Sequence, residues 1–305
     1  NNYLGNGLTV NAKLDLSEES IKGKFSLKNP NYKNSDKSIY TNIQSSETNR
    51  LSDFGYKTNK TGFTFGTDFE YYDDLFLGVG INSYYENIET DSTASSQQQK
   101  LKGNYFDNFV SLTFDFDKRN QKFQTTQGYR NYFTTDLPLI SETNTFANTF
   151  ITTNYFEYFN NNVLKSSFYF RNSNSISGDN VKLSERLYLP SNRLRGFEKG
   201  KVGPKDGNDF IGGNYIASLN FSSDIPKLLE NSQTTDLLIF LDIANVWGVD
   251  YDSGLESSDE VKSAIGIGLD WFSPIGPMNF SLSQHLTKGS NDITESFRFN
   301  LGTTF

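Results

Sequence analysis

Apolar and polar residues alternate along most of the chain. In one segment, Leu75, Leu77, Val79 and Ile81 alternate with Phe76 and two glycines. The same period of two recurs at 110–117, 183–189, 215–222, 264–271 and 296–305. A period of two places successive side chains on opposite faces of an extended strand. The sequence therefore predicts about fourteen strands of roughly ten residues, no helix, and one antiparallel all-β unit.

The lengths of the connections favour a transmembrane barrel. Short turns at 72–74 and 273–277 alternate with long polar loops near 90–106, 175–212, 248–260 and 286–295. Outer-membrane barrels have short turns at one end and long loops at the other. In lipid, every backbone group must pair within the protein, so strands span the bilayer only as a closed sheet with its apolar face outward. The polar face would then line a wet lumen. A soluble β-sandwich is the alternative, because its strands also alternate.

The amino-acid composition narrows the classes of function that the chain can have. The chain is 35% hydrophobic but 15% aromatic, which fits aromatic girdles at two membrane interfaces. The apolar run 237–241 stops at Asp242, far short of the roughly 18 residues of a transmembrane helix. A net charge of -8 argues against a nucleic-acid partner. With no Cys and only His285, we expect no metal centre, no cofactor and, since no acid/base pair stands out, no enzyme.

The segment SNRLRGFEKGKVGPKDG at 191–207 is too polar to be a buried strand. Its glycines permit tight backbone conformations, and Arg195 is a planar, permanently charged donor that favours carboxylate partners. Taken alone, the segment reads equally well as a solvated surface loop.

Together with later segments, this loop resembles the BamA family within the BamA/TamA superfamily of outer-membrane insertases. The matching stretches keep their order: Leu194-Arg195-Gly196-Phe197, then 202–206, 211–214, 241–247, 266–277 and 297–305. These motifs cover the C-terminal third specifically. The first two thirds are similar mainly in strand rhythm.

The resemblance implies a sixteen-stranded barrel whose sixth loop folds back into the lumen. Arg195, within the Arg-Gly-Phe motif with Gly196 and Phe197, would dock on Asp242. Alternation agrees: residues 237, 239, 241 and 243 are apolar and face one way, which places Phe240 and Asp242 on the polar side. The family often adds a Glu on the preceding strand as a second acceptor.

At the position of that Glu this chain has Asn220. The sequence leaves open whether the anchor is weaker here or whether Asp224 or Asp270 contributes instead.

The resemblance also defines a gate. Residues 1–305 would be the C-terminal barrel domain, with the first two strands and the periplasmic POTRA domains absent from this chain. The last strand would be one side of a lateral seam, with the residues Phe297, Phe299, Leu301, Gly302 and Phe305. Gly302 would allow this strand to bend, because glycine weakens a strand interior.

The implied function is assembly of β-barrel proteins in the cell outer membrane by β-augmentation. The implied partners are unfolded barrel clients, outer-membrane lipoproteins of an assembly complex, periplasmic chaperones acting through the missing domains, and the bilayer. Alternatives are a related translocation barrel (TamA-like or two-partner secretion), the anchor of a hydrolase, and a passive pore.

Overall fold

A computed structural model describes residues 7–17, 19–122, 124–158, 162–225, 235–251, 255, 260–273 and 276–301. Fourteen strands form one antiparallel sheet in chain order, which confirms the predicted fold class and strand number. They are β1 (Thr9–Leu16), β2 (Ser20–Asn29), β3 (Lys37–Arg50), β4 (Tyr56–Tyr72), β5 (Leu75–Thr90), β6 (Gly103–Asp117), β7 (Gly128–Ser141), β8 (Thr145–Tyr158), β9 (Asn162–Ser175), β12 (Tyr215–Asp224), β13 (Thr235–Trp247), β14 (Lys262–Ser273), β15 (Gly276–Thr287) and β16 (Phe297–Leu301).

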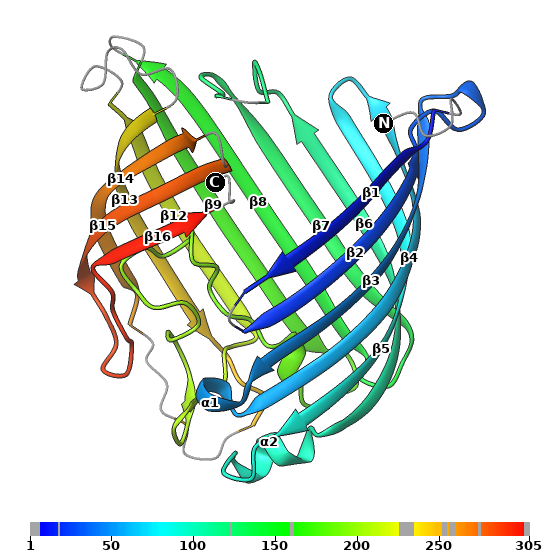
Figure 1. The fold of residues 1–305 in the computed structure, drawn as a ribbon, viewed down its shortest axis with the longest axis vertical. Coiled ribbons are helices and arrows are strands. Elements are labelled where there is room, and N and C mark those ends of the chain that lie inside the picture. The colour runs from blue at the N-terminus through cyan, green and yellow to red at the C-terminus, as the bar shows by residue number, and fades with distance from the viewer. Residues whose placement is uncertain are drawn as a thin grey trace.

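The sheet curls around a central space, and its two end strands are β1 and β16 (Figure 1). Across the described residues the ladder does not close between them. A separate small hairpin, β10 (Lys205–Asp206) with β11 (Asp209–Phe210), belongs to the connection between β9 and β12.

The two rims of the barrel differ only in part as the connection lengths predict, because the three-residue turn 142–144 lies on the rim of the long connections. One rim carries short turns such as 73–74. The other carries the long connection 176–214 and the described ends of the connection between β13 and β14, together with α1 (Leu51–Phe54) and α2 (Ser96–Lys100) (Figure 1). The expectation of no helix was wrong for these two single turns; α2 begins with a capping box in which Ser95 and Gln98 bond each other's backbone N–H groups. No helix in the described ranges is long and apolar enough to cross a bilayer.

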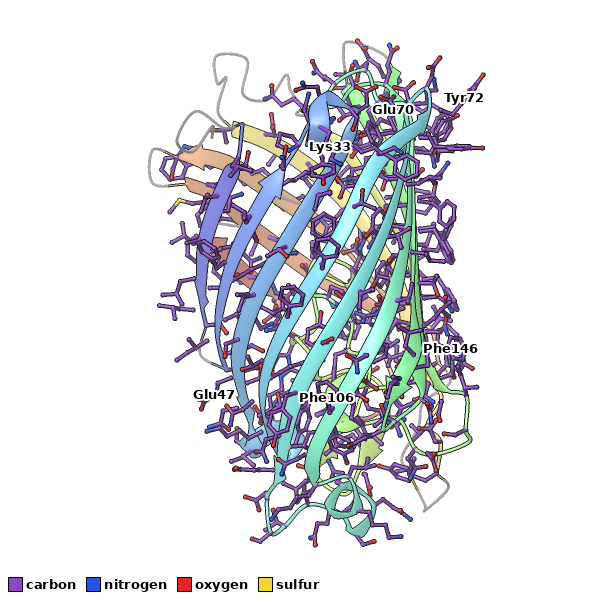
Figure 2. The ribbon with its side chains drawn as sticks, turned by 90° about the vertical axis from the view of Figure 1, so that its right-hand side faces the viewer. Lys33, Glu47, Glu70, Tyr72, Phe106 and Phe146 are labelled. Atoms are coloured by element: carbon purple, nitrogen blue, oxygen red, sulfur yellow. The ribbon has the colours of Figure 1, made fainter. Side chains whose placement is uncertain are left out.

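The outer face of the sheet is apolar. Large side chains such as Phe65, Ile81 and Ile267 are exposed there, alternating with residues that face inward. Figure 2 shows charged side chains such as Glu70 and Glu47 toward the two ends of the strands. An apolar band of this extent fits a lipid environment rather than water.

The lining of the lumen is less polar than the alternation of residues suggests. Toward the long-loop rim it holds an apolar cluster in which loop residues meet inward-facing wall residues: Tyr169, Leu187, Leu189, Leu194, Phe197, Val202, Ile216, Ala244, Val246 and Ala264. The wall is apolar here because the 176–214 connection folds inside and covers it.

Candidate functional site

The connection between β9 and β12, residues 176–214, forms the candidate site; we call it the lumen loop. It contacts β5 and β6 on one side of the barrel and β13 on the other. Two glycines allow it to lie close to the wall. A Cβ at Gly196 (φ 89°) would come within 3.1 Å of Ala264 and Ser283, and one at Gly203 (φ 100°) within 2.9 Å of Val246. Both the positive φ and the close approach require glycine.

The structure brings Arg195, Phe240 and Asp242 together. Arg195 donates from Nε to Asp242 Oδ2 at 2.7 Å and from Nη2 to Oδ1 at 2.8 Å, and its backbone N–H reaches Oδ2 at 3.0 Å. The guanidinium also lies 3.5 Å from the centre of the Phe240 ring. Because Asp242 is 0% exposed, this bidentate pair is shielded from solvent. Phe197, the last residue of the motif, is buried against the ring of His285.

Asn220 plays a part that differs from the expected second acid. It lies opposite Asp242 in the β12–β13 register, and its Nδ2 donates to Asp242 Oδ1 at 2.9 Å and to the carbonyl oxygen of Arg193 at 2.8 Å. The amide thus completes the hydrogen bonding of Asp242 without adding charge. Of the described residues, Asp242 alone accepts hydrogen bonds from Arg195, so Asp224 and Asp270 do not substitute for the missing Glu.

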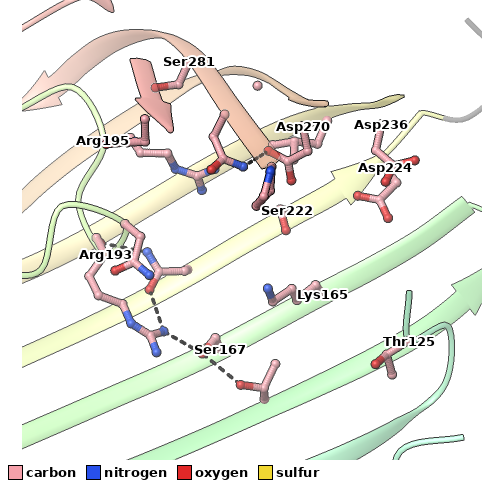
Figure 3. A pocket seen from close by; sticks show the side chains of 18 of the residues that line it. Thr125, Lys165, Ser167, Arg193, Arg195, Ser222, Asp224, Asp236, Asp270 and Ser281 are labelled. Atoms are coloured by element: carbon pink, nitrogen blue, oxygen red, sulfur yellow. Dashed lines mark hydrogen bonds between the residues drawn. The ribbon is translucent and has the colours of Figure 1, made fainter. Parts of the chain in front are cut away.

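A cavity of about 640 Å³ lies beside this pair, toward the short-turn rim. Figure 3 shows its two sides. Lys165 on β9 and Arg193 on the lumen loop supply positive charge, and Asp224, Asp236 and Asp270 on β12 to β14 supply negative charge. In the part of the chain that the structure describes, no group of three or more His, Cys, Asp or Glu side chains could hold a metal ion.

A second buried anchor holds the other limb of the lumen loop. Lys182 Nζ lies 2.5 Å from Asp107, 3.2 Å from Glu86 and 3.1 Å from Glu185. Ser184 adds a hydrogen bond to Glu86 at 2.9 Å. The side chain of Lys182 is 1% exposed.

Burial shapes the titration of this second anchor. Burial alone would lower the pKa of Lys182, but the carboxylates of Glu185, Glu86 and Asp107 outweigh it and raise that pKa above its ordinary value. Burial raises the pKa of Glu185. Sequence reasoning missed this anchor, since Lys182 has no motif around it and Glu86 and Asp107 are only two among many polar positions on inward faces.

The predicted gate strand is partly described. Phe297, Phe299 and Leu301 on β16 all face outward and are exposed. Gly302 and Phe305 lie outside the described residues. β16 pairs with β15 over five register pairs, from Phe297 opposite Leu282 to Leu301 opposite Met278.

The apolar outer face, the antiparallel sheet and the loop bound inside it define a membrane-spanning β-barrel occupied by its own loop. The Omp85 superfamily domain matches residues 2–305, and the chain belongs to that superfamily. It is 24% identical over 256 residues to the outer membrane protein assembly factor BamA of Neorickettsia risticii, covering 82% of this chain and 34% of that protein. It is 30% identical over 139 residues to BamA of Neisseria meningitidis, covering 37% of this chain and 17% of that protein.

Solved structures agree on the fold. The crystal structure of BamA from Haemophilus ducreyi lacking POTRA domains 1–3 has a TM-score of 0.86 at 20% identity, covering 98% of this chain and 64% of that one. CdiB from Acinetobacter baumannii has a TM-score of 0.54 at 9% identity, covering 95% of this chain and 52% of that one. The chain is therefore an outer-membrane β-barrel of the Omp85 superfamily, and it spans about a third or less of the length of the curated relatives it matches.

Proposed function

We propose that this barrel inserts and folds β-barrel proteins into the outer membrane by β-augmentation at a lateral seam formed by β16. The observation that carries the proposal is the open edge of β16: within the described residues β16 pairs with β15 alone, and the ladder does not continue from β16 to β1. The unpaired N–H and C=O groups of such an edge are a template for pairing with another strand. The similarity to BamA proteins of two species supports the same function.

The physical work requires no covalent chemistry, so the protein acts without enzymatic turnover or cofactor. An unfolded strand in lipid leaves its N–H and C=O groups unpaired, and each such group costs several kcal/mol. Pairing with the edge of β16 satisfies one side of the client strand, and the next hairpin of the client satisfies the other side. Lipoprotein partners and periplasmic chaperones would bind parts of the protein outside this barrel.

Photo-cross-linking in vesicles tests this function. The full-length protein is reconstituted with a photoreactive amino acid at Phe299 on β16 or, as the control, at Phe114 on β6; both side chains are 44% exposed on the outer face. A denatured client barrel is then added. We expect cross-links to the client at 299 and not at 114, and faster client folding than in empty vesicles.

Two results would contradict the proposal. Equal cross-linking at both positions would show that the client reaches the barrel through the lipid without using the seam. A client that ends inside the vesicle, not embedded in the bilayer, would instead indicate translocation of a passenger.

A further inference from the structure

The chain that leads into β16 runs along the lumen loop as a short ladder. The backbone N–H of Glu295 donates to the carbonyl oxygen of Gly196 at 3.1 Å, and that of Glu198 donates to Ile293 at 2.9 Å. The N–H of Ile293 in turn donates to the carbonyl oxygen of Lys201 at 3.1 Å. The last strand is therefore fastened to the lumen loop before its own ladder with β15 begins.

Arg298 extends this attachment into β16 itself. Its side chain faces the cavity and is largely buried. One Nη donates to the carbonyl oxygen of Ser191, the other donates to that of Phe197, and Nε pairs with Glu295. Ser191 and Phe197 flank Arg195 in the sequence. The same turn of the lumen loop is thus bound by Asp242 from β13 and by Arg298 from β16.

The two attachments depend on each other through the position of this turn. When Arg195 is bound to Asp242, the turn holds both carbonyl oxygens where the planar fork of Arg298 can reach them. If the turn moved away, Arg298 would face the cavity with Glu295 as its remaining partner, and a buried cation that loses hydrogen bonds is costly. Within the described residues β16 pairs only with β15, so one ladder alone offsets that loss.

We propose that Arg298 couples the Arg195–Asp242 pair to the last strand, so that release of the lumen loop loosens β16. The consequence for client insertion rests on the proposed function, whereas the coupling itself is a property of the barrel. Arg298 is a positioning residue: it affects the seam only by keeping β16 in its position.

Disulfide formation measures this coupling directly, because these 305 residues contain no Cys and any Cys elsewhere in the full-length protein is first replaced by Ser. Leu282→Cys with Phe297→Cys joins register partners on β15 and β16, and Phe168→Cys with Leu219→Cys joins register partners on β9 and β12 as a reference. In the full-length protein in vesicles, we expect Arg298→Gln to lower the β15–β16 disulfide yield about fivefold, the equivalent of about one lost hydrogen bond. The β9–β12 yield should not change.

The matched controls separate coupling from general damage. Asn300→Ala, which alters the same face of β16, should leave both yields unchanged. Asp242→Asn should lower the β15–β16 yield as Arg298→Gln does, and the two changes together should lower it no further. Arg298→Lys, which keeps the charge but lacks the planar fork, serves where Arg298→Gln does not fold, and it should show the same selective loss.

An unchanged β15–β16 yield in the Arg298 variants would overturn the proposal, and so would effects of Asp242→Asn and Arg298→Gln that add. Because the yield is measured without a client, the two proposals fail separately. If the β15–β16 disulfide yield falls but client insertion is normal, the coupling through Arg298 stands, and its role in client insertion at the seam is excluded.

Discussion

Two of the anchors that hold the lumen loop to the barrel wall balance charge differently. At the first, one Arg meets one Asp, and a neutral amide from Asn220 fills the remaining hydrogen-bond position. At the second, Lys182 meets three carboxylates. The first anchor is matched, with one cation for one carboxylate. The second carries excess acid and can take up a proton, so it tolerates change better.

The largest expected effect comes from breaking the matched anchor. Arg195→Ala leaves Asp242 charged and buried without its cation, which should reduce the free energy of unfolding by about 3–5 kcal/mol while the strands still form. Heat-dependent mobility of the barrel in detergent measures this loss. Arg193→Ala is the control: that guanidinium donates to Ser167 and, at 3.5 Å, to Asn220, and it lies over Tyr169. Within the described ranges it forms no salt bridge, so the loss should be clearly smaller. An equal loss of unfolding free energy in both variants would show that the Arg195–Asp242 pair stabilises the barrel no more than the contacts of Arg193 do.

A smaller effect is expected at the acid-rich anchor. Lys182→Met should reduce the free energy of unfolding by about 2 kcal/mol at neutral pH, because the three carboxylates lose their shared cation. The loss should shrink at lower pH, because burial raises the pKa of Glu185 and this carboxyl takes up a proton first. Urea unfolding in detergent at both pH values tests this. If the loss of unfolding free energy is as large as that of Arg195→Ala and equal at both pH values, the two anchors do not differ in the way described.

Adding an acid to the matched anchor should make it behave like the second one. Asn220→Asp keeps the size of the side chain but replaces the donor to Asp242 with a second carboxylate. We expect a loss of about 1–2 kcal/mol at neutral pH that recovers on acidification, when a protonated Asp can donate again. Asn220→Ala removes the donor without adding charge, so its loss should not depend on pH. Unfolding midpoints across a pH series distinguish the two variants.

The smallest effect, with the opposite sign, is expected at Glu185. The folded-state pKa of Glu185 is raised above the ordinary value of 4.5, so its contribution to stability is greatest below that value and is lost as the pH rises through the folded-state pKa. Lys182 does not change charge in this range, because its folded-state pKa is raised and its contribution persists below the ordinary value of 10.5. Glu185→Gln should therefore have a slightly higher unfolding midpoint than the native protein at neutral pH. The variant's stability should also depend less on pH. A lower unfolding midpoint at neutral pH would contradict this reading.

Alternation along the chain was enough to predict much of this architecture. It gave the strand number, and the parity of 237–243 placed Phe240 and Asp242 on the inner face, where the structure has them. It could not reveal the apolar cluster in the lumen or the carboxylates around Lys182. Those depend on where a 39-residue connection, 176–214, folds in space, and a period of two carries no information about that.

The position of Arg298 shows the same limit. Its inward direction follows from the alternation of β16, but its acceptors are two backbone carbonyl oxygens. Backbone acceptors leave no mark on residue identity, so only the docked loop shows what Arg298 binds. The substitution of Asn220 for an expected Glu was visible in the sequence, whereas its role as donor to Asp242 required the register of β12 and β13.

The long sequence separation of the loop contacts has a consequence for how this barrel itself forms. Neighbouring strands can pair as hairpins while the chain is being completed, but Lys182 and Glu86 are 96 residues apart, and Arg298 and Ser191 are 107 residues apart. Contacts between residues so far apart in the sequence form slowly, because closing the intervening loop loses conformational entropy before the contact can stabilise it. The contact of Arg298 with the loop also requires the last strand. Hydrogen exchange during refolding should therefore protect the β3–β4 hairpin first and the backbone N–H groups of Glu198 and Glu295 last.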